Sequence, residues 1–146
     1  MKTVLSIGAG FLQAPAIRKA RELGYRVLGV DGDAAAAGVG DCDLFRAIDI
    51  KDREACCDFA REEGVVGVFV AATDVGVLTG AWIAEQLGLP GLRYATAQRL
   101  KNKCQVRARF VEAKLPDNCR YVEIQDLTGA ATQCQEIGFP VIVKPV

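Results

Sequence analysis

Several absences narrow what this 146-residue chain can do. It contains no histidine, so neither a Ser-His-Asp nor a Cys-His catalytic arrangement can be built from these residues. Its six cysteines include no C-x-x-C pair, and without histidine they match no common zinc-site spacing. The sequence therefore excludes nucleophilic triads within these residues and gives no sign of a metal centre.

Charge and hydropathy exclude further classes of protein. Lysine plus arginine equals aspartate plus glutamate, at 18 each, so the composition predicts no basic face for nucleic acid. No apolar run approaches the roughly 20 residues that span a membrane, and the run after Lys2 is too short for a signal peptide. We expect a cytoplasmic protein whose thiols are free and mostly buried, and not paired in disulfides.

The first 95 residues alternate between strands and helices. Apolar runs predict strands at 3–7, 26–30, 44–50 and 65–71. Helical periodicity and capping residues predict helices at about 16–23, 52–63 and 74–87. The continuous apolar run at 65–71 is typical of a strand buried on both faces. This order predicts an α/β fold, a Rossmann-like parallel sheet with flanking helices.

The pattern changes beyond about residue 95. It predicts helices at 96–101 and 103–113, a turn at 115–118, a strand at 120–124, a helix at 126–137 and a strand at 138–143. We therefore expect two domains, a Rossmann-like domain over residues 1–95 and the start of an α+β domain over residues 96–146. Because no partner strand follows the last one, the chain looks truncated at Val146.

The turn after the first strand is a candidate ligand site. Gly8 and Gly10 let the backbone turn sharply and approach a bound group. Asp31 ends the second strand, about where a ribose-binding acid lies in dinucleotide-binding folds. A dinucleotide fingerprint would need a third glycine at the position of Gln13. From these residues alone, a tight turn without a ligand remains an alternative.

Two lysines are candidates for binding an anion. Lys144 follows the apolar segment 138–143, where a buried ammonium would need a partner such as phosphate. A solvated strand end explains Lys144 equally well. Lys103 lies at the break between two helical segments, and a solvated helix face explains it if it is taken alone.

Taken in order, these segments resemble the ATP-grasp ligases. The segments that carry the resemblance are 7–10, 15–20, 22–24, 30–31, 84–91, 102–103, 112–116 and 138–145. They are similar to the N-terminal (pre-ATP-grasp) domain and the start of the ATP-grasp domain in ligases of the biotin carboxylase and carbamoyl phosphate synthetase type. Two residues depart from the family pattern: Asn102 replaces an aspartate, and Lys114 stands where glycine is frequent.

The resemblance implies a fragment of an ATP-dependent carboxylate–amine ligase. In such a ligase ATP phosphorylates a carboxylate, and an amine then displaces phosphate from the acyl phosphate. Catalysis depends mainly on positioning and on neutralising the phosphate charge. The magnesium ligands are expected beyond residue 146, so this chain alone is expected to be inactive.

The resemblance also implies roles for individual residues. Lys103 and Lys144 fall on the two lysines that hold the ATP phosphates. Gly8 and Gly10 fall on the turn that faces the carboxylate or acyl-acceptor substrate. Asp31, Thr73 and Asp74, at the carboxyl ends of their strands, are further candidates to bind that substrate.

Two other functions remain open from the sequence. Gly8, Gly10 and Asp31 are compatible with an NAD(P)-dependent oxidoreductase, although Gln13 and the segment ending in Lys144 count against it. The chain could also be a non-catalytic module that binds a small acid. In each case the expected partners are small molecules, with no nucleic acid or membrane, and the sequence leaves open whether the chain forms a homo-oligomer.

Overall fold

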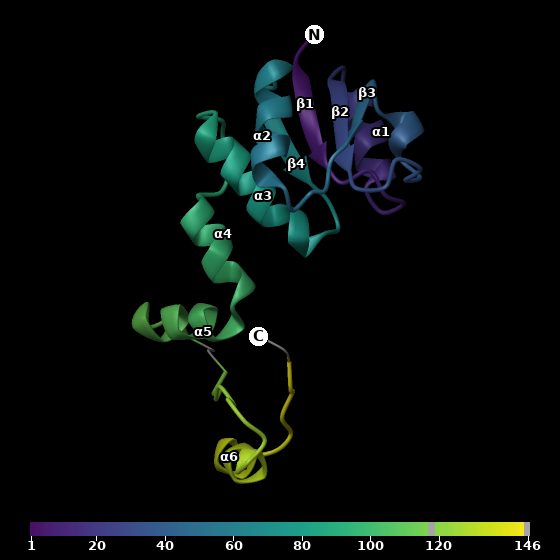
Figure 1. The fold of residues 1–146 in the computed structure, drawn as a ribbon. Coiled ribbons are helices and arrows are strands. Elements are labelled where there is room, and N and C mark those ends of the chain that lie inside the picture. The colour runs from purple at the N-terminus through teal and green to yellow at the C-terminus, as the bar shows by residue number, and fades with distance from the viewer. Residues whose placement is uncertain (117–118, 145–146) are drawn as a thin grey trace. The chain divides into compact units, whose positions relative to one another are not determined.

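The structure is a computed structural model that describes residues 1–116 and 119–144. The chain forms two compact units, Met1–Ala97 and Gln98–Val146 (Figure 1). Helix α4 (Tyr94–Lys101) runs across this division, so the domain boundary expected after residue 95 falls inside a helix. The turn expected at 115–118 lies partly outside the described residues, and residues 145–146 lie wholly outside them.

The first unit is a four-stranded parallel sheet with helices packed against it. Its strands are β1 (Thr3–Ile7), β2 (Arg26–Asp31), β3 (Leu44–Ala47) and β4 (Gly67–Val70), in the order β3-β2-β1-β4. Its helices are α1 (Ala14–Glu22), α2 (Arg53–Glu62) and α3 (Asp74–Gln86), with a short 3-10 helix η1 at Val39–Asp41. The predicted α/β fold, a Rossmann-like sheet with flanking helices, is confirmed.

Side chains of alternate strand residues form two separate cores. Leu5 and Leu28 pack with Phe59 of α2 and Ile83 of α3 on one face of the sheet. The second core contains the neighbouring strand positions. There Ile17 of α1 packs in one cluster with Val4, Ala9, Val27 and Phe69. Because successive strand side chains point to opposite faces, the apolar runs of β1 and β2 fill both cores.

Two burial expectations are wrong. The run at 65–71 does not form a strand buried on both faces, because β1 is the one strand beside β4 among the described residues and every residue of β4 is partly exposed. Helical spacing with Ile17 and Ala20 also predicts that Leu23 faces the core, but α1 ends at Glu22 and the side chain of Leu23 is 66% exposed. In both cases the position of the residue at an edge or an end, which the pattern does not show, sets its exposure.

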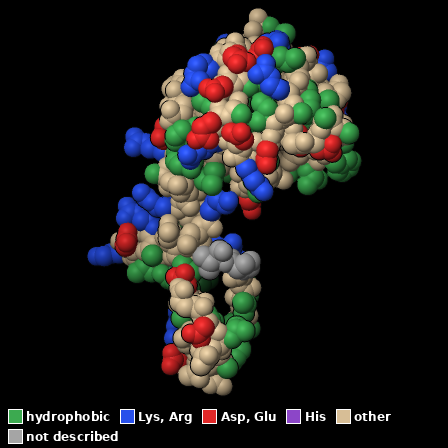
Figure 2. All heavy atoms as spheres, in the orientation of Figure 1, with side chains coloured by type: hydrophobic (Ala, Val, Ile, Leu, Met, Phe, Trp, Pro, Cys, Tyr) green, Lys and Arg blue, Asp and Glu red, His purple; other side chains and the backbone are tan. Residues whose placement is uncertain are grey.

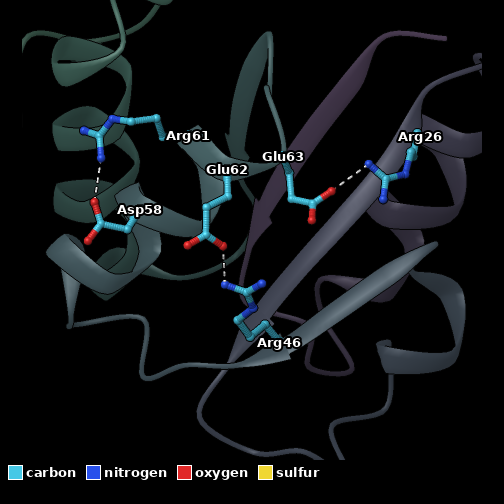
Figure 3. Close-up of polar contacts among 6 residues, drawn as sticks. All are labelled: Arg26, Arg46, Asp58, Arg61, Glu62 and Glu63. Carbon is cyan, nitrogen blue, oxygen red and sulfur yellow. Dashed lines mark hydrogen bonds and ion pairs between the residues drawn. The ribbon is translucent and has the colours of Figure 1, made fainter.

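Ion pairs join the C-terminal end of α2 to two strands (Figure 3). Arg26 of β2 contacts Glu63 at 3.0 Å, and Arg46 of β3 contacts Glu62 at 2.8 Å. The Arg46 guanidinium also lies 4.2 Å from the centre of the Phe59 ring. Ion pairs that reach solvent contribute up to about 1 kcal/mol each, so these two pairs add little to the stability that the buried apolar side chains of α2 provide.

The second unit has helices and no buried residue among its described positions (98–116 and 119–144). It contains α5 (Lys103–Glu112) and α6 (Ala130–Ile137). The strands predicted at 120–124 and 138–143 are not formed, because no described segment pairs with them. Figure 2 shows apolar side chains open to solvent on this unit, and Leu127 is 90% exposed. The described residues therefore show helices where an α+β domain was expected.

The structure records six free cysteines. They are Cys56 and Cys57, which are buried, Cys42, Cys104 and Cys134, which are partly exposed, and Cys119, which is exposed. The expectation that most thiols are buried is therefore wrong. Burial raises the pKa of the Cys56 thiol to about 12 and that of Cys42 to about 11, so both are protonated, weak nucleophiles at neutral pH.

We predict that Gly29→Ala destabilises the first unit. A Cβ at this position in β2 would lie 2.5 Å from the Cys42 Sγ atom and 3.5 Å from the Phe45 ring. Overpacking of this kind typically costs about 1–3 kcal/mol of unfolding free energy, which urea denaturation measures. Cys42→Ala removes the clashing sulfur, so the double variant should recover part of the loss. If the double variant loses as much unfolding free energy as the two single variants together, this account is contradicted.

We predict that Lys114→Gly stabilises the end of α5. Lys114 follows the C-cap residue Ala113 with a φ of +51°, and its N–H donates to the Val111 carbonyl at 3.0 Å. A side chain in this left-handed conformation costs about 1 kcal/mol or more, which glycine avoids. Amide exchange over residues 103–113 should therefore slow several-fold. Lys114→Ala is the control, and equal slowing in Lys114→Ala would show that lost charge is the cause.

Candidate ligand site at the carboxyl edge of the sheet

The carboxyl ends of β1, β2 and β4 bring most of the predicted site residues together. Because the strands are parallel and adjacent, the chain leaves all of them at one edge of the sheet. The carboxyl-edge site is defined here as residues 8–13 after β1, Asp31 at the end of β2, and residues 71–74 after β4. It includes five of the seven predicted site residues: Gly8, Gly10, Asp31, Thr73 and Asp74.

Asp31 holds the glycine turn in place. Its Oδ2 atom accepts a hydrogen bond from the Ala9 N–H at 2.9 Å, and its Oδ1 atom accepts one from the Asp33 N–H at 3.0 Å. Gly8 has a φ of +96°, and its N–H donates to the Val30 carbonyl at 2.8 Å. A left-handed φ of this kind favours glycine. Both oxygens of Asp31 thus bind backbone amides of the protein.

The start of α1 offers no spare amide to an anion in its first turn. The Ala14 N–H donates to the Gly10 carbonyl at 3.0 Å, and the N–H groups of Ala16 and Ile17 donate to the Gln13 carbonyl at 2.9 and 3.1 Å. Pro15 has no N–H. Dinucleotide-binding folds place the diphosphate on free amides at this helix end. These bonds leave no free amide among residues 14–17 for a diphosphate.

Gln13 crosses the site from one loop to the other. Its side-chain Nε2 atom donates to the Ala71 carbonyl at 2.6 Å, and the residue is 8% exposed. A Cβ on Gly10 would lie 2.9 Å from Gln13 Oε1, and one on Gly8 would lie 3.3 Å from Gln13 Cγ. The carboxamide therefore fills the space beside both glycines. In the sequence Gln13 is noticeable only as a missing glycine, although a polar residue directly before α1 could have drawn attention to it.

The loop after β4 carries strain and two polar side chains for which no bond to a described residue is found. Ala72 has a φ of +50°, and non-glycine residues in this conformation are concentrated at functional sites. Thr73 is the N-cap of α3, but its side chain makes no capping hydrogen bond. Asp74 is exposed in the first turn of α3, and no described residue pairs with it. Both side chains are therefore free to reach a ligand.

Gly76 lets the start of α3 lie close to β1. A Cβ at this position would be 2.9 Å from Ile7 Cγ2 and 3.2 Å from Val70 Cγ1. Gly76 is buried, so a side chain here would push the first turn of α3 away from the sheet. The absence of a side chain at Gly76 thus helps to place Thr73 and Asp74 at the carboxyl edge.

The two predicted phosphate-binding lysines lie in the second unit. Lys103 is the first residue of α5, directly after Asn102, whose Oδ1 atom caps the helix by accepting from the Gln105 N–H at 2.9 Å. Asparagine thus caps the helix as well as an aspartate would. Lys144 is exposed and lies outside any strand. Neither lysine forms an ion pair with a described residue.

Other surface features do not coincide with these residues. Two hollows are lined by residues of α3 and of the segment after it, and Ala84, Gly91 and Leu92 line both. No predicted site residue lines either hollow. Within residues 1–116 and 119–144, no group of three or more His, Cys, Asp or Glu side chains could hold a metal ion. No described helix is both long and apolar enough to cross a membrane.

Comparisons with known proteins relate the chain to one group of enzymes. No family model matches the chain. It is 24% identical over 144 residues to the formate-dependent phosphoribosylglycinamide formyltransferase of Wolinella succinogenes, an alignment that covers 98% of this chain and 37% of that protein. The chain therefore spans little more than a third of this curated relative.

Solved structures have the same fold over nearly the whole chain. Phosphoribosylglycinamide synthetase from Anaerococcus prevotii matches with a TM-score of 0.78 at 21% identity, over 99% of this chain and 37% of that one. The biotin carboxylase domain of Hydrogenobacter thermophilus 2-oxoglutarate carboxylase, a dimer in complex with MgADP, ADP and bicarbonate, matches with a TM-score of 0.69 at 19% identity, over 95% and 33%. These findings confirm the resemblance to ATP-grasp enzymes at the level of the fold, over about a third of the length of those chains.

Proposed function

We propose that this chain is the N-terminal part of an ATP-dependent carboxylate–amine ligase that works through an acyl phosphate. Residues 1–95 would form its pre-ATP-grasp domain, and residues 96–146 would begin its nucleotide-binding domain. The observation that carries this proposal is the carboxyl-edge site, where Asp31 and Gln13 hold the glycine turn and the first turn of α1 offers no amide to a phosphate. A cytoplasmic enzyme fits these features.

In this proposal the carboxyl-edge site binds the carboxylate or amine substrate. Gly8 and Gly10 would face the substrate with their backbone, because Asp31 and Gln13 hold the turn that carries them. The free side chains of Thr73 and Asp74 would orient the substrate. Positioning of this kind is a large part of the rate enhancement in reactions between two bound partners.

Lys103 and Lys144 would hold the phosphates of ATP. Both are described residues without an ion-pair partner, which suits a compact charge that neutralises a phosphate. ATP would supply the phosphoryl group that activates the carboxylate. The family resemblance implies that the ligands of Mg²⁺ lie beyond residue 146, so we expect residues 1–146 alone to be inactive.

The full-length protein should be stabilised by Mg-ATP and not by NAD(H) or NADP(H). A ligand present at about 100 times its dissociation constant adds about 2.7 kcal/mol to the stability of the protein that binds it. Thermal unfolding with each nucleotide in turn measures this effect. Stabilisation by a nicotinamide nucleotide, with none by Mg-ATP, would overturn the ligase proposal and make Asp31 the residue to substitute next.

Lys103→Gln and Lys144→Gln should each weaken ATP binding by the full-length protein. Hydrogen bonds to charged groups contribute about 1.5–3 kcal/mol, which corresponds to a loss of affinity of at least about tenfold. Isothermal titration with Mg-ATP measures the dissociation constants. Lys101→Gln is the matched control because Lys101 is an exposed neighbour at the end of α4. An equal loss in all three variants would indicate general charge attraction and contradict these specific roles.

A further inference from the structure

Gln13 is the most buried polar side chain at the carboxyl-edge site, and the proposed function gives it no contact with a ligand. It is the N-cap residue of α1 but makes no side-chain capping bond. A glutamine is not a preferred residue at an N-cap, where serine, threonine, aspartate and asparagine contribute more to helix stability. The placement of Gln13 therefore needs an explanation other than helix capping.

The nitrogen of the Gln13 carboxamide joins two loops that are far apart in the sequence. The Nε2 atom donates to the carbonyl of Ala71, which is 58 residues away, at 2.6 Å. Ala71 directly precedes Ala72, whose φ of +50° is unfavourable for a residue with a side chain. A short hydrogen bond to the preceding carbonyl helps to hold this conformation, and with it the position of Thr73.

The oxygen of the same carboxamide has no partner in the described part of the chain. Among residues 1–116 and 119–144, no donor reaches Gln13 Oε1. Gln13 Oε1 is not fully buried. Among the described residues, the fully buried side-chain acceptor without a partner is Gln133 Oε1. A residue that is 92% buried thus presents one free acceptor at the surface of the site. Partly buried acceptors of this kind gain most from a ligand that donates a hydrogen bond.

We propose that Gln13 is a positioning residue of the carboxyl-edge site. Its nitrogen fastens the turn after β1 to the loop after β4, and its oxygen accepts a hydrogen bond from a ligand that carries an N–H or O–H donor. The ligand part of this inference rests on the proposed function, in which the site binds a carboxylate or amine substrate. It favours the amine, or a protonated group of the acid, as the part of the substrate that contacts Gln13.

Two substitutions separate the two roles of the side chain. Gln13→Glu keeps an acceptor oxygen of similar shape but cannot donate to the Ala71 carbonyl, whereas Gln13→Leu removes donor and acceptor together. Gln86→Glu and Gln86→Leu are matched controls, because Gln86 is an exposed glutamine at the end of α3. Gln13→Ser places a preferred capping residue at the start of α1 and guards against loss of the helix.

Hydrogen–deuterium exchange tests the fastening role directly in the full-length protein. Exchange over residues 71–78 should be at least about tenfold faster in all three Gln13 variants than in wild type, with residues 3–7 of β1 unchanged. The Gln86 variants should change neither segment. Equal acceleration in 71–78 and 3–7 would mean that Gln13 is a packing residue that contributes to global stability, and unchanged exchange in 71–78 would mean that the bond holds nothing. Either result overturns the proposal.

Steady-state kinetics tests the ligand role. With the acid–amine pair that gives the fastest ADP release in a screen of the common amino acids, KM for the amine should rise at least tenfold in Gln13→Leu and less in Gln13→Glu. KM for ATP should not change in either variant. Equal KM values for the amine in Gln13→Leu and wild type would refute the ligand role. If no pair releases ADP, the ligase proposal fails, while the exchange experiment still decides whether Gln13 fastens the two loops.

Discussion

The hydrogen bond from the Ala9 N–H to the Asp31 carboxylate is the contact on which the proposed substrate site depends. It joins the turn after β1 to the end of β2, and the Gln13 side chain joins the same turn to the end of β4. The parallel order of these three strands makes both bonds possible. Without them the glycine turn would keep its conformational freedom, and the residues around it would have no fixed relation to one another.

The same contacts explain why a Rossmann-like sheet need not bind a dinucleotide. Asp31 occupies the position of a ribose-binding acid, but both of its oxygens accept backbone N–H groups. The amides of the first turn of α1 are bonded internally or removed by Pro15. The Gln13 carboxamide fills the space beside Gly10 that a diphosphate would approach. Under the proposed function, a common fold would present a different chemistry through a few residues at one edge.

The sequence predicts those features that depend on neighbouring residues. The strand–turn–helix order around Gly8, the Asp52 cap of α2 and the helix break at Asn102 all follow from local patterns. The exposure of β4 does not, because it depends on which strand lies beside it. The bond between Gln13 and Ala71 spans 58 residues, so no local pattern indicates it. The strands expected at 120–124 and 138–143 have no pairing partner among the described residues, and a strand is stable only beside another.

The place where ATP binds is the central point of this account, and amide NMR of the full-length protein locates it most directly. On titration with Mg-ATP, we expect the amide signals of residues 102–106 around Lys103 to shift. The signals of residues 8–13 should stay in place, since the carboxyl-edge site is assigned to the other substrate. Shifts centred on residues 8–13, with none around Lys103, would contradict the account and return the glycine turn to the role of a nucleotide site.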